Sequence, residues 1–290
     1  MEFKYIDLPR LTKWTVEKII DAIQKGLNEV EVTLDLGLSK EKVVIENNTV
    51  VFRGKYRVKL DLLKEISENR VYEVVGDNEI VEISIRTEHM YKLRPVSETD
   101  APTLEIDGIH MHRITGITPW EDSRRKVLAA KIGKGDIVLD TCMGLGYTAI
   151  HALLRGASKV YTVEVDENVI AIAQRNPWSK MLSDKRIEII HGDVTEVVRY
   201  FPTEYFDKII HDPPRFSRRT GNLYGLKFYL ELHRVLKPGG ILFHYTGEPG
   251  KRGARKIVKG IGERLSRAGF HTMYDREVQG YVAIKYAIPF

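Results

Sequence analysis

The stretch "DIVLDTCMGLGYTAI", residues 136–150, decides the fold. A short apolar run ends on a carboxylate, Asp140, and is followed by a turn containing Gly144 and Gly146 and then by a run with helical spacing. Glycine has no Cβ, so the backbone at these two positions can come close to a bound group. Two glycines at this spacing also occur in ordinary tight turns. The segments that follow must therefore decide whether this turn binds a ligand.

Apolar strands and helical segments alternate after residue 136. The predicted strands are 136–140, 159–165, 186–193, 206–212 and 240–247, and the predicted helices between and after them are 148–156, 168–176, 194–201, 223–237 and 254–269. Such alternation is typical of a parallel sheet with helices on both faces. The runs 270–279 and 281–288 meet at Gly280 without a helix between them, which predicts a final antiparallel pair.

The first part of the chain has a different rhythm. A helical pattern ending at Gly26 is followed by an alternating strand at 29–36 and by two hairpins, one turning at Asn47–Asn48 and one near Gly76–Asn78. We therefore predict an α+β domain over residues 1–113, for substrate recognition or another accessory role, and a second domain over 114–290. The expected fold class is α/β: a Rossmann-like, doubly wound, seven-stranded sheet with a C-terminal antiparallel strand pair, plus the small N-terminal domain.

Composition narrows the class of protein. No apolar run approaches the ~20 residues of a membrane helix, and the N-terminus lacks the apolar core of a secretory signal. A single cysteine, Cys142, excludes an intramolecular disulfide and a multi-cysteine zinc site, and no metal site is expected. These features predict a cytoplasmic protein. Residues 1–100 carry 16 Lys+Arg and 19 Asp+Glu, so the remainder holds 29 and 21, a net +8 that favours phosphate-bearing partners.

Acidic residues end three successive predicted strands: Asp140, Glu164 and Asp193. Glu164 follows Gly146 by 18 positions, close to the spacing at which a carboxylate holds a ribose diol. Asp193 would lie beside the same crevice and could accept a hydrogen bond from an adenine amino group. Each acid taken singly could equally be a helix cap or a solvated charge. Because the ends of parallel strands meet at one edge, the three together predict a nucleotide-like cofactor there.

The motifs "VLDTCMGLGYT", "VYTVEVDENVIAIAQRN", "IIHGDV", "DPPRF" and "LKPGGIL" resemble, in order and spacing, those of the class I S-adenosylmethionine-dependent methyltransferases. The resemblance covers residues 118–290. It implies S-adenosylmethionine as cofactor and the cofactor-binding residues Asp140, Cys142, Gly144, Gly146, Glu164, Asp193 and Val194. Asp166 is a second candidate beside Glu164. Cys142 stands where the family usually has glycine, and we expect it to be a small buried side chain rather than a reactive thiol.

The stretch "HDPPRFS", residues 211–217, carries the predicted chemistry. It delivers Asp212 to the cofactor edge, and Pro213 and Pro214 stiffen the loop while their carbonyl groups remain acceptors. A carboxylate and a prolyl carbonyl form a rigid pair of acceptors for an NH2 group. Asp212 would stabilise the positive charge that grows on the nitrogen, and in-line positioning supplies much of the remaining acceleration. Asp212 and Pro213 are thus the predicted catalytic residues.

In the resembling family, Asp, Asn or Ser followed by Pro-Pro and an aromatic residue marks methylation of amino groups, often on nucleobases. Here Arg215 takes the aromatic place and Phe216 follows, and either can stack on a base. The predicted substrate-binding residues are Pro214, Arg215, Phe216, Arg218 and Arg219. The whole chain resembles an archaeal family of predicted methyltransferases linked to cytidine-N4 methylation of ribosomal RNA, which implies an RNA partner and that amine as target.

Two other classes of function stay open. One is a transferase acting on a small amine or polyamine with S-adenosylmethionine or its decarboxylated form, which predicts acids rather than arginines around the pocket. The other is an inactive, cofactor-binding RNA assembly protein. Among further candidates, His211 could be a general base, although amine methylation can release its proton to water. Tyr224 and Tyr229 are expected to be packing residues, with the alternative that one of them lines the pocket. His110 and His112, on one face of a predicted strand, are more consistent with packing or substrate contact than with a metal pair.

Overall fold

The computed structural model describes residues 1–217, 220–247 and 254–286. It divides into two compact units. One contains residues 1–3, 121–167 and 182–290, and the other contains residues 4–120 and 168–181. Each unit draws on both sides of residue 113, and the domain boundary at that residue stays a prediction. No helix in the described ranges combines the length and the apolar character that crossing a membrane demands.

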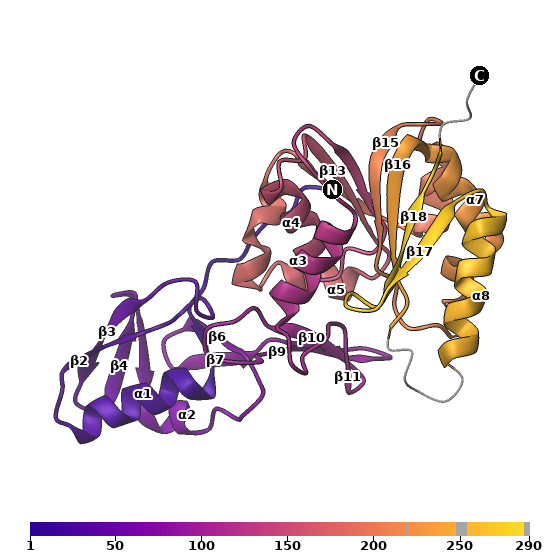
Figure 1. The fold of residues 1–290 in the computed structure, drawn as a ribbon. Coiled ribbons are helices and arrows are strands. Elements are labelled where there is room, and N and C mark those ends of the chain that lie inside the picture. The colour runs from indigo at the N-terminus through magenta and orange to yellow at the C-terminus, as the bar shows by residue number, and fades with distance from the viewer. Residues whose placement is uncertain (218–219, 248–253, 287–290) are drawn as a thin grey trace. The chain divides into compact units, whose positions relative to one another are not determined.

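A seven-stranded sheet forms the centre of the first unit (Figure 1). Its strands lie in the order β14 (Ile187–His191), β13 (Lys159–Glu164), β12 (Ile137–Asp140), β15 (Phe206–His211), β16 (Leu236–Tyr245), β18 (Gly280–Ile284) and β17 (His271–Asp275). The pairs from β14 to β16 are parallel, and β18 is antiparallel to both neighbours. The predicted fold class, including the antiparallel C-terminal pair, is confirmed.

One face of this sheet is covered by α6 (Val194–Val197), α7 (Leu226–Val235) and α8 (Ala254–Arg267). Their apolar side chains pack with every second residue of the strands, among them Leu139, Ile209 and Leu242. Helix α4 (Tyr147–Leu154) contacts β12 and β13 and places Thr148 against Asp140, so it lies on the opposite face. The alternation of side chains along each strand therefore builds two apolar layers around one sheet.

Helix α3 (Pro119–Ala129) begins at a proline, which suits the first turn of a helix because its φ is already helical and no N–H is needed there. Within the first unit its residues Asp122, Ser123, Lys126 and Val127 are buried, as is Ala130 directly after its last residue. Their spacing of three and four positions forms one stripe along the helix. Three members of this stripe are polar, which is uncommon for a buried helix face. Buried charged side chains require partners of opposite charge.

The second unit contains three small antiparallel sheets. Their orders are β1–β6–β7, β2–β3–β4–β5 and β11–β10–β9–β8. The strands are β1 (Arg10–Leu11), β2 (Glu29–Val32), β3 (Glu41–Glu46), β4 (Thr49–Phe52), β5 (Tyr56–Lys59), β6 (Tyr72–Gly76), β7 (Glu79–Glu82), β8 (Ser84–Arg86), β9 (Met90–Arg94), β10 (Thr103–Ile106) and β11 (Ile109–His110). Both predicted hairpins are present, as β3–β4 and β6–β7.

The helices of this unit are α1 (Lys13–Gln24), α2 (Leu60–Lys64) and α5 (Glu167–Ala173), the last of which begins one residue before the unit's second segment. Strand β11 ends at His110, so the expectation that His110 and His112 share a strand face is wrong. His110 bonds to Glu105, and His112 bonds to Thr103.

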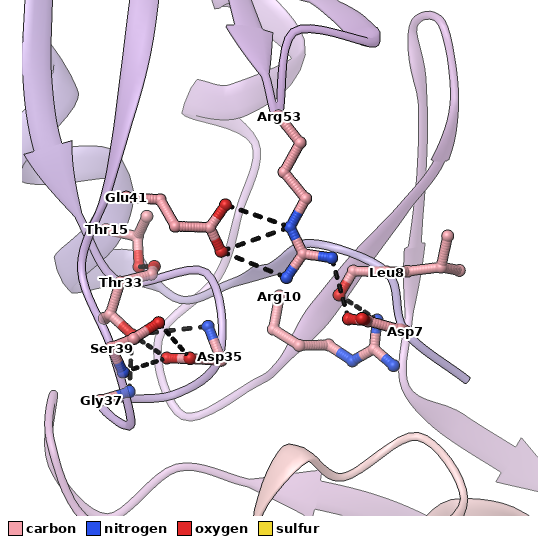
Figure 2. Close-up of polar contacts among 10 residues, drawn as sticks. All are labelled: Asp7, Leu8, Arg10, Thr15, Thr33, Asp35, Gly37, Ser39, Glu41 and Arg53. Carbon is pink, nitrogen blue, oxygen red and sulfur yellow. Dashed lines mark hydrogen bonds and ion pairs between the residues drawn. The ribbon is translucent and has the colours of Figure 1, made fainter. Parts of the chain in front are cut away.

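Buried and half-buried arginines tie the second unit together. Arg10 is fully buried and donates to the carbonyl oxygens of Leu8 and Arg175, and it lies 3.4 Å from a carboxylate oxygen of Glu73. Figure 2 shows Arg53 from the β4–β5 turn reaching Glu41 on one side and Asp7 on the other. Polar side chains thus connect the N-terminal segment to the four-stranded sheet.

Substitution of Gly146 should destabilise the first unit more than substitution of Gly135. Both glycines have a left-handed backbone, with φ +80° and +87°. Gly135→Ala meets open space and should cost only the left-handed strain, about 1–2 kcal/mol. Gly146→Ala would also place Cβ 2.5 Å from a methyl carbon of Leu182, adding about 1–3 kcal/mol of overpacking. Thermal denaturation should rank the wild type above Gly135→Ala and Gly135→Ala above Gly146→Ala; equal losses would contradict the close contact.

Candidate active site at the carboxyl edge of the sheet

Asp212 lies directly after β15 and is bound by a buried lysine. The ammonium Nζ of Lys126 donates to Asp212 Oδ2 at 2.6 Å. The side chain of Lys126 is 1% exposed, whereas that of Asp212 is 18% exposed. Oδ1 of Asp212 has no hydrogen-bond partner in the described ranges. One carboxylate oxygen is thus committed to the protein and the other remains an acceptor.

A second carboxylate completes this buried cluster. Asp122 Oδ2 lies 2.9 Å from the same Nζ, one helical turn before Lys126 on α3. The ring of Tyr245, at the end of β16, lies with its centroid 4.1 Å from Nζ. Burial lowers the pKa of Lys126, but Asp212 and Asp122 outweigh it, so that the pKa is raised and the lysine keeps its proton. With both acids ionised, the cluster carries a net charge of −1.

The two prolines after Asp212 lie in a loop that Tyr224 fastens. The Tyr224 hydroxyl, from the short 3-10 helix Gly221–Tyr224, donates to the Pro214 carbonyl oxygen at 2.7 Å. The carbonyl oxygen of Pro213 receives no hydrogen bond within the described part of the chain. Only one of the two prolyl acceptors is therefore available, and it belongs to the residue beside Asp212. Tyr224 is buried, but it contacts the site instead of serving as packing alone.

Phe216 and Arg215 both face solvent at this loop. Phe216 is 51% exposed, and its ring meets that of Tyr224 edge to face with centroids 5.4 Å apart. Arg215 is exposed, and its carbonyl oxygen accepts from the Thr220 hydroxyl at 2.8 Å. Arg218 and Arg219 lie outside the described residues, so their predicted role stays a prediction.

His211 is held as a neutral ring beneath the loop. Its Nε2 donates to the Leu223 carbonyl oxygen at 2.9 Å, and its Nδ1 accepts from the Thr141 hydroxyl at 2.6 Å. Burial lowers the pKa of His211 to about 3. A fully buried imidazole with both nitrogens engaged has the role of fixing the strand end, which argues against its use as a general base.

Asp140 is buried at the end of β12. Its carboxylate accepts from the hydroxyls of Thr162 at 2.7 Å and Thr148 at 3.1 Å. Burial raises the pKa of Asp140 to about 7, with Thr162 and Thr148 opposing the rise. The structure therefore places this predicted cofactor residue beneath the edge, where it holds β12, β13 and α4 together.

Glu164 lies at the neighbouring strand end with its carboxylate facing the glycine turn. It accepts from the backbone N–H groups of Gly144, Val165 and Asp166, each at 3.0 Å. Burial raises the pKa of Glu164, and the bonds from Asp166 and Gly144 lower it. A carboxylate has about four acceptor positions, so one remains for a ligand hydroxyl before any backbone bond is exchanged.

The third strand end presents Asp193 to solvent. One oxygen, Oδ1, caps α6 by accepting from the backbone N–H and the hydroxyl of Thr195, both at 2.8 Å. Val194 is buried in the core at the start of α6. Cys142 is half-buried in the glycine turn, and burial raises the pKa of its thiol well above the usual range, which keeps it protonated.

Parallel pairing brings these predicted residues to one edge. Asp140 pairs with Thr162 and Ile210, and Glu164 pairs with His191, so the ends of β12 to β15 are adjacent. The donor chemistry fits S-adenosylmethionine: Glu164 for ribose, the open Asp193 oxygen for the adenine amine, and a cluster of net negative charge for a sulfonium. No group of three metal-ligating side chains occurs among the described residues.

Sequence reasoning missed Lys126 and Asp122, and it left open whether Tyr224 contacts the site. Asp122 and Lys126 are four positions apart, a spacing that most often marks a solvated ion pair on a helix surface. The signal that could have found them is the stripe on α3, where both fall at core positions together with Val127 and Ala130.

The site lies within the part of the chain that a family model matches. Residues 111–252 match the family model "Conserved hypothetical protein 95". "Ribosomal RNA large subunit methyltransferase I" of Serratia proteamaculans is 32% identical over 53% of this chain, and its counterpart in Photobacterium profundum is 29% identical over 51%. The chain spans only 40% and 39% of the lengths of these two relatives.

Spermidine synthase from Thermotoga maritima is a similar solved structure, with a TM-score of 0.54 at 21% identity, covering 71% of this chain and 72% of that one. It supports the fold alone. The family model and the two relatives support the predicted place among the class I S-adenosylmethionine-dependent methyltransferases, with S-adenosylmethionine as cofactor.

One relative matches nearly the whole chain. The "Uncharacterized protein MJ1233" of the archaeon Methanocaldococcus jannaschii is 43% identical, and the match covers 97% of this chain and 98% of that protein. The match therefore extends over the N-terminal part of the chain as well as over the part that holds the site. The chain belongs to the same protein family as MJ1233.

Proposed function

We propose that the chain methylates an exocyclic amino group of a nucleobase in RNA, with N4 of cytidine in ribosomal RNA as the favoured target. The observation that carries the proposal is the pair formed by Asp212 Oδ1 and the neighbouring Pro213 carbonyl group at the cofactor edge, neither of which has a hydrogen-bond partner among the described residues. Each oxygen can accept one N–H of an NH2 group. The names of the ribosomal RNA methyltransferase relatives support RNA as the substrate class.

Bound S-adenosylmethionine supplies a methyl group on a sulfonium. The lone pair of the substrate nitrogen forms the new C–N bond as the C–S bond breaks, and the electron pair of the C–S bond stays on sulfur. The nitrogen then loses one proton to water. The residues of this chain supply position and charge. Asp212 and the Pro213 carbonyl orient the nitrogen. The net negative cluster of Asp122, Lys126 and Asp212 favours the cation that forms on it. The neutral His211 takes no part in proton transfer.

Asp212→Ala should lower kcat by at least about 100-fold, since a positioned acceptor for developing charge is worth roughly that much. The affinity for S-adenosylmethionine, measured by calorimetry, should stay within a few-fold. Glu188→Ala, which removes a half-exposed acid on β14, is the matched control and should keep full activity. Unchanged methyl transfer by Asp212→Ala would remove the mechanism.

Phe216 should stack on the target base. Its ring is exposed yet fixed against Tyr224, so less freedom is lost on binding than for the exposed Arg215. Phe216→Ala should raise KM for RNA by about 5- to 150-fold, the equivalent of 1–3 kcal/mol of base stacking. Arg215→Ala should have the smaller effect, mainly through phosphate attraction. A larger effect of Arg215→Ala would assign the platform to arginine instead.

Labelled S-adenosylmethionine should identify the substrate class. The enzyme is incubated separately with total RNA, with DNA and with a polyamine mixture, and we expect label in the RNA alone. Nucleoside mass spectrometry of RNA from a strain lacking the gene should then show the loss of N4-methylcytidine. Label in the polyamine fraction would favour the small-amine transferase, and label in no fraction would favour a non-catalytic role in RNA assembly.

A further inference from the structure

Among the residues that the structure describes, Lys126 is the one buried cation in contact with the proposed acceptor. It comes from α3, which lies 86 positions before Asp212 in the sequence, so a helix outside the cofactor motifs reaches the reaction centre. The 2.6 Å bond to Asp212 Oδ2, the 2.9 Å contact with Asp122 and the Tyr245 ring at 4.1 Å surround the ammonium on three sides. Desolvating a lysine is costly, and such a group is retained where its charge has a use.

We propose that Lys126 is a positioning residue for methyl transfer: it turns Oδ2 of Asp212 toward α3, keeps the carboxylate ionised, and leaves Oδ1 as the single side-chain acceptor for the substrate amine. Asp122 holds the ammonium in place. The inference rests on the proposed function, because it assigns a role to Lys126 only through Asp212.

Asp212 needs this partner because its surroundings otherwise favour the protonated acid. The titratable groups that face it in the described part of the chain are Asp122 and Lys126 from α3, Asp140 from β12, Cys142 from the glycine turn, and Tyr224 near the loop. Among these only Lys126 is cationic. Burial raises the pKa of Asp212, Asp122 raises it further, and Lys126 lowers it. A protonated Asp212 carries a hydrogen on one of its two oxygens. It could then no longer accept hydrogen bonds from both Lys126 and the substrate amine.

Removing Lys126 and removing Asp122 should therefore shift the acid limb of the kcat profile in opposite directions. Lys126→Met keeps the length of the side chain but removes the charge, so the pKa of Asp212 rises and the acid limb moves to higher pH. At a pH below the raised pKa of Asp212, the ionised fraction falls about tenfold for each unit between them. The kcat at neutral pH should therefore fall by at least about tenfold and recover in part at alkaline pH. Asp122→Asn removes a negative neighbour, so the acid limb should move to lower pH. Lys126→Arg should restore the wild-type limb in part.

Two further measurements separate this role from a merely structural one. In an Asp212→Asn background, Lys126→Met should cause no additional loss of kcat, because the two residues act as one unit. In the cofactor-free protein, carbon-13 NMR of aspartate carboxyl groups, with the Asp212 signal assigned by its absence from Asp212→Asn, should show the pKa of Asp212 raised by Lys126→Met and lowered by Asp122→Asn. If Lys126→Met fails to fold, the changes in the pKa of Asp212 caused by Asp122→Asn and Lys126→Arg still test whether Lys126 positions Asp212.

The outcomes also separate this inference from the proposed function. A wild-type pH profile for both Lys126→Met and Asp122→Asn, or limbs that shift in the same direction, would overturn the role of Lys126 while Asp212→Ala remains inactive. Full activity of Asp212→Ala would instead overturn the proposed function itself.

Discussion

The bond between Lys126 and Asp212 is the interaction on which the proposed chemistry depends. It joins a helix that precedes the cofactor turn to the end of the strand that carries the reactive loop. Two carboxylates around one ammonium leave the site with one negative charge, in a place that is nearly closed to water. In such surroundings a small net charge has a large effect on a sulfonium or on an amine that is becoming cationic.

Around this pair, the fold brings separate strand ends to one edge, and the acid at each end has different hydrogen-bond partners. Asp140 is committed to the threonine hydroxyls beneath the edge, Glu164 to the glycine turn, and Asp193 to the first turn of α6. Acids that look alike in the sequence thus differ in how much of their acceptor capacity remains. Asp193 and Asp212 each keep one oxygen without a partner among the described residues, but only Asp212 lies beside the Pro213 carbonyl group, which is why we assign the substrate amine to it.

Much of the sheet could be predicted from the sequence. The five parallel strands have strong apolar runs, and the glycine turn, the acids and the Asp-Pro-Pro loop identify the functional edge. The small sheets of the N-terminal part could be predicted only as one strand and two hairpins, since strands of two to six residues have little periodicity. The Lys126–Asp212 contact could not be found by spacing, because it depends on which face of α3 meets β15. The same holds for the Tyr224 bond that removes one prolyl carbonyl group from use.

The shared ammonium makes three positions interdependent. A charge change at residue 122, 126 or 212 alone alters the net charge of a nearly dry cluster, whereas paired changes can preserve it. Across the family of this chain, we therefore expect these positions to vary together. Members that have a neutral residue in place of Asp212 should also lack the lysine at position 126. Substitutions in α3 should therefore accompany substitutions in the Asp-Pro-Pro loop.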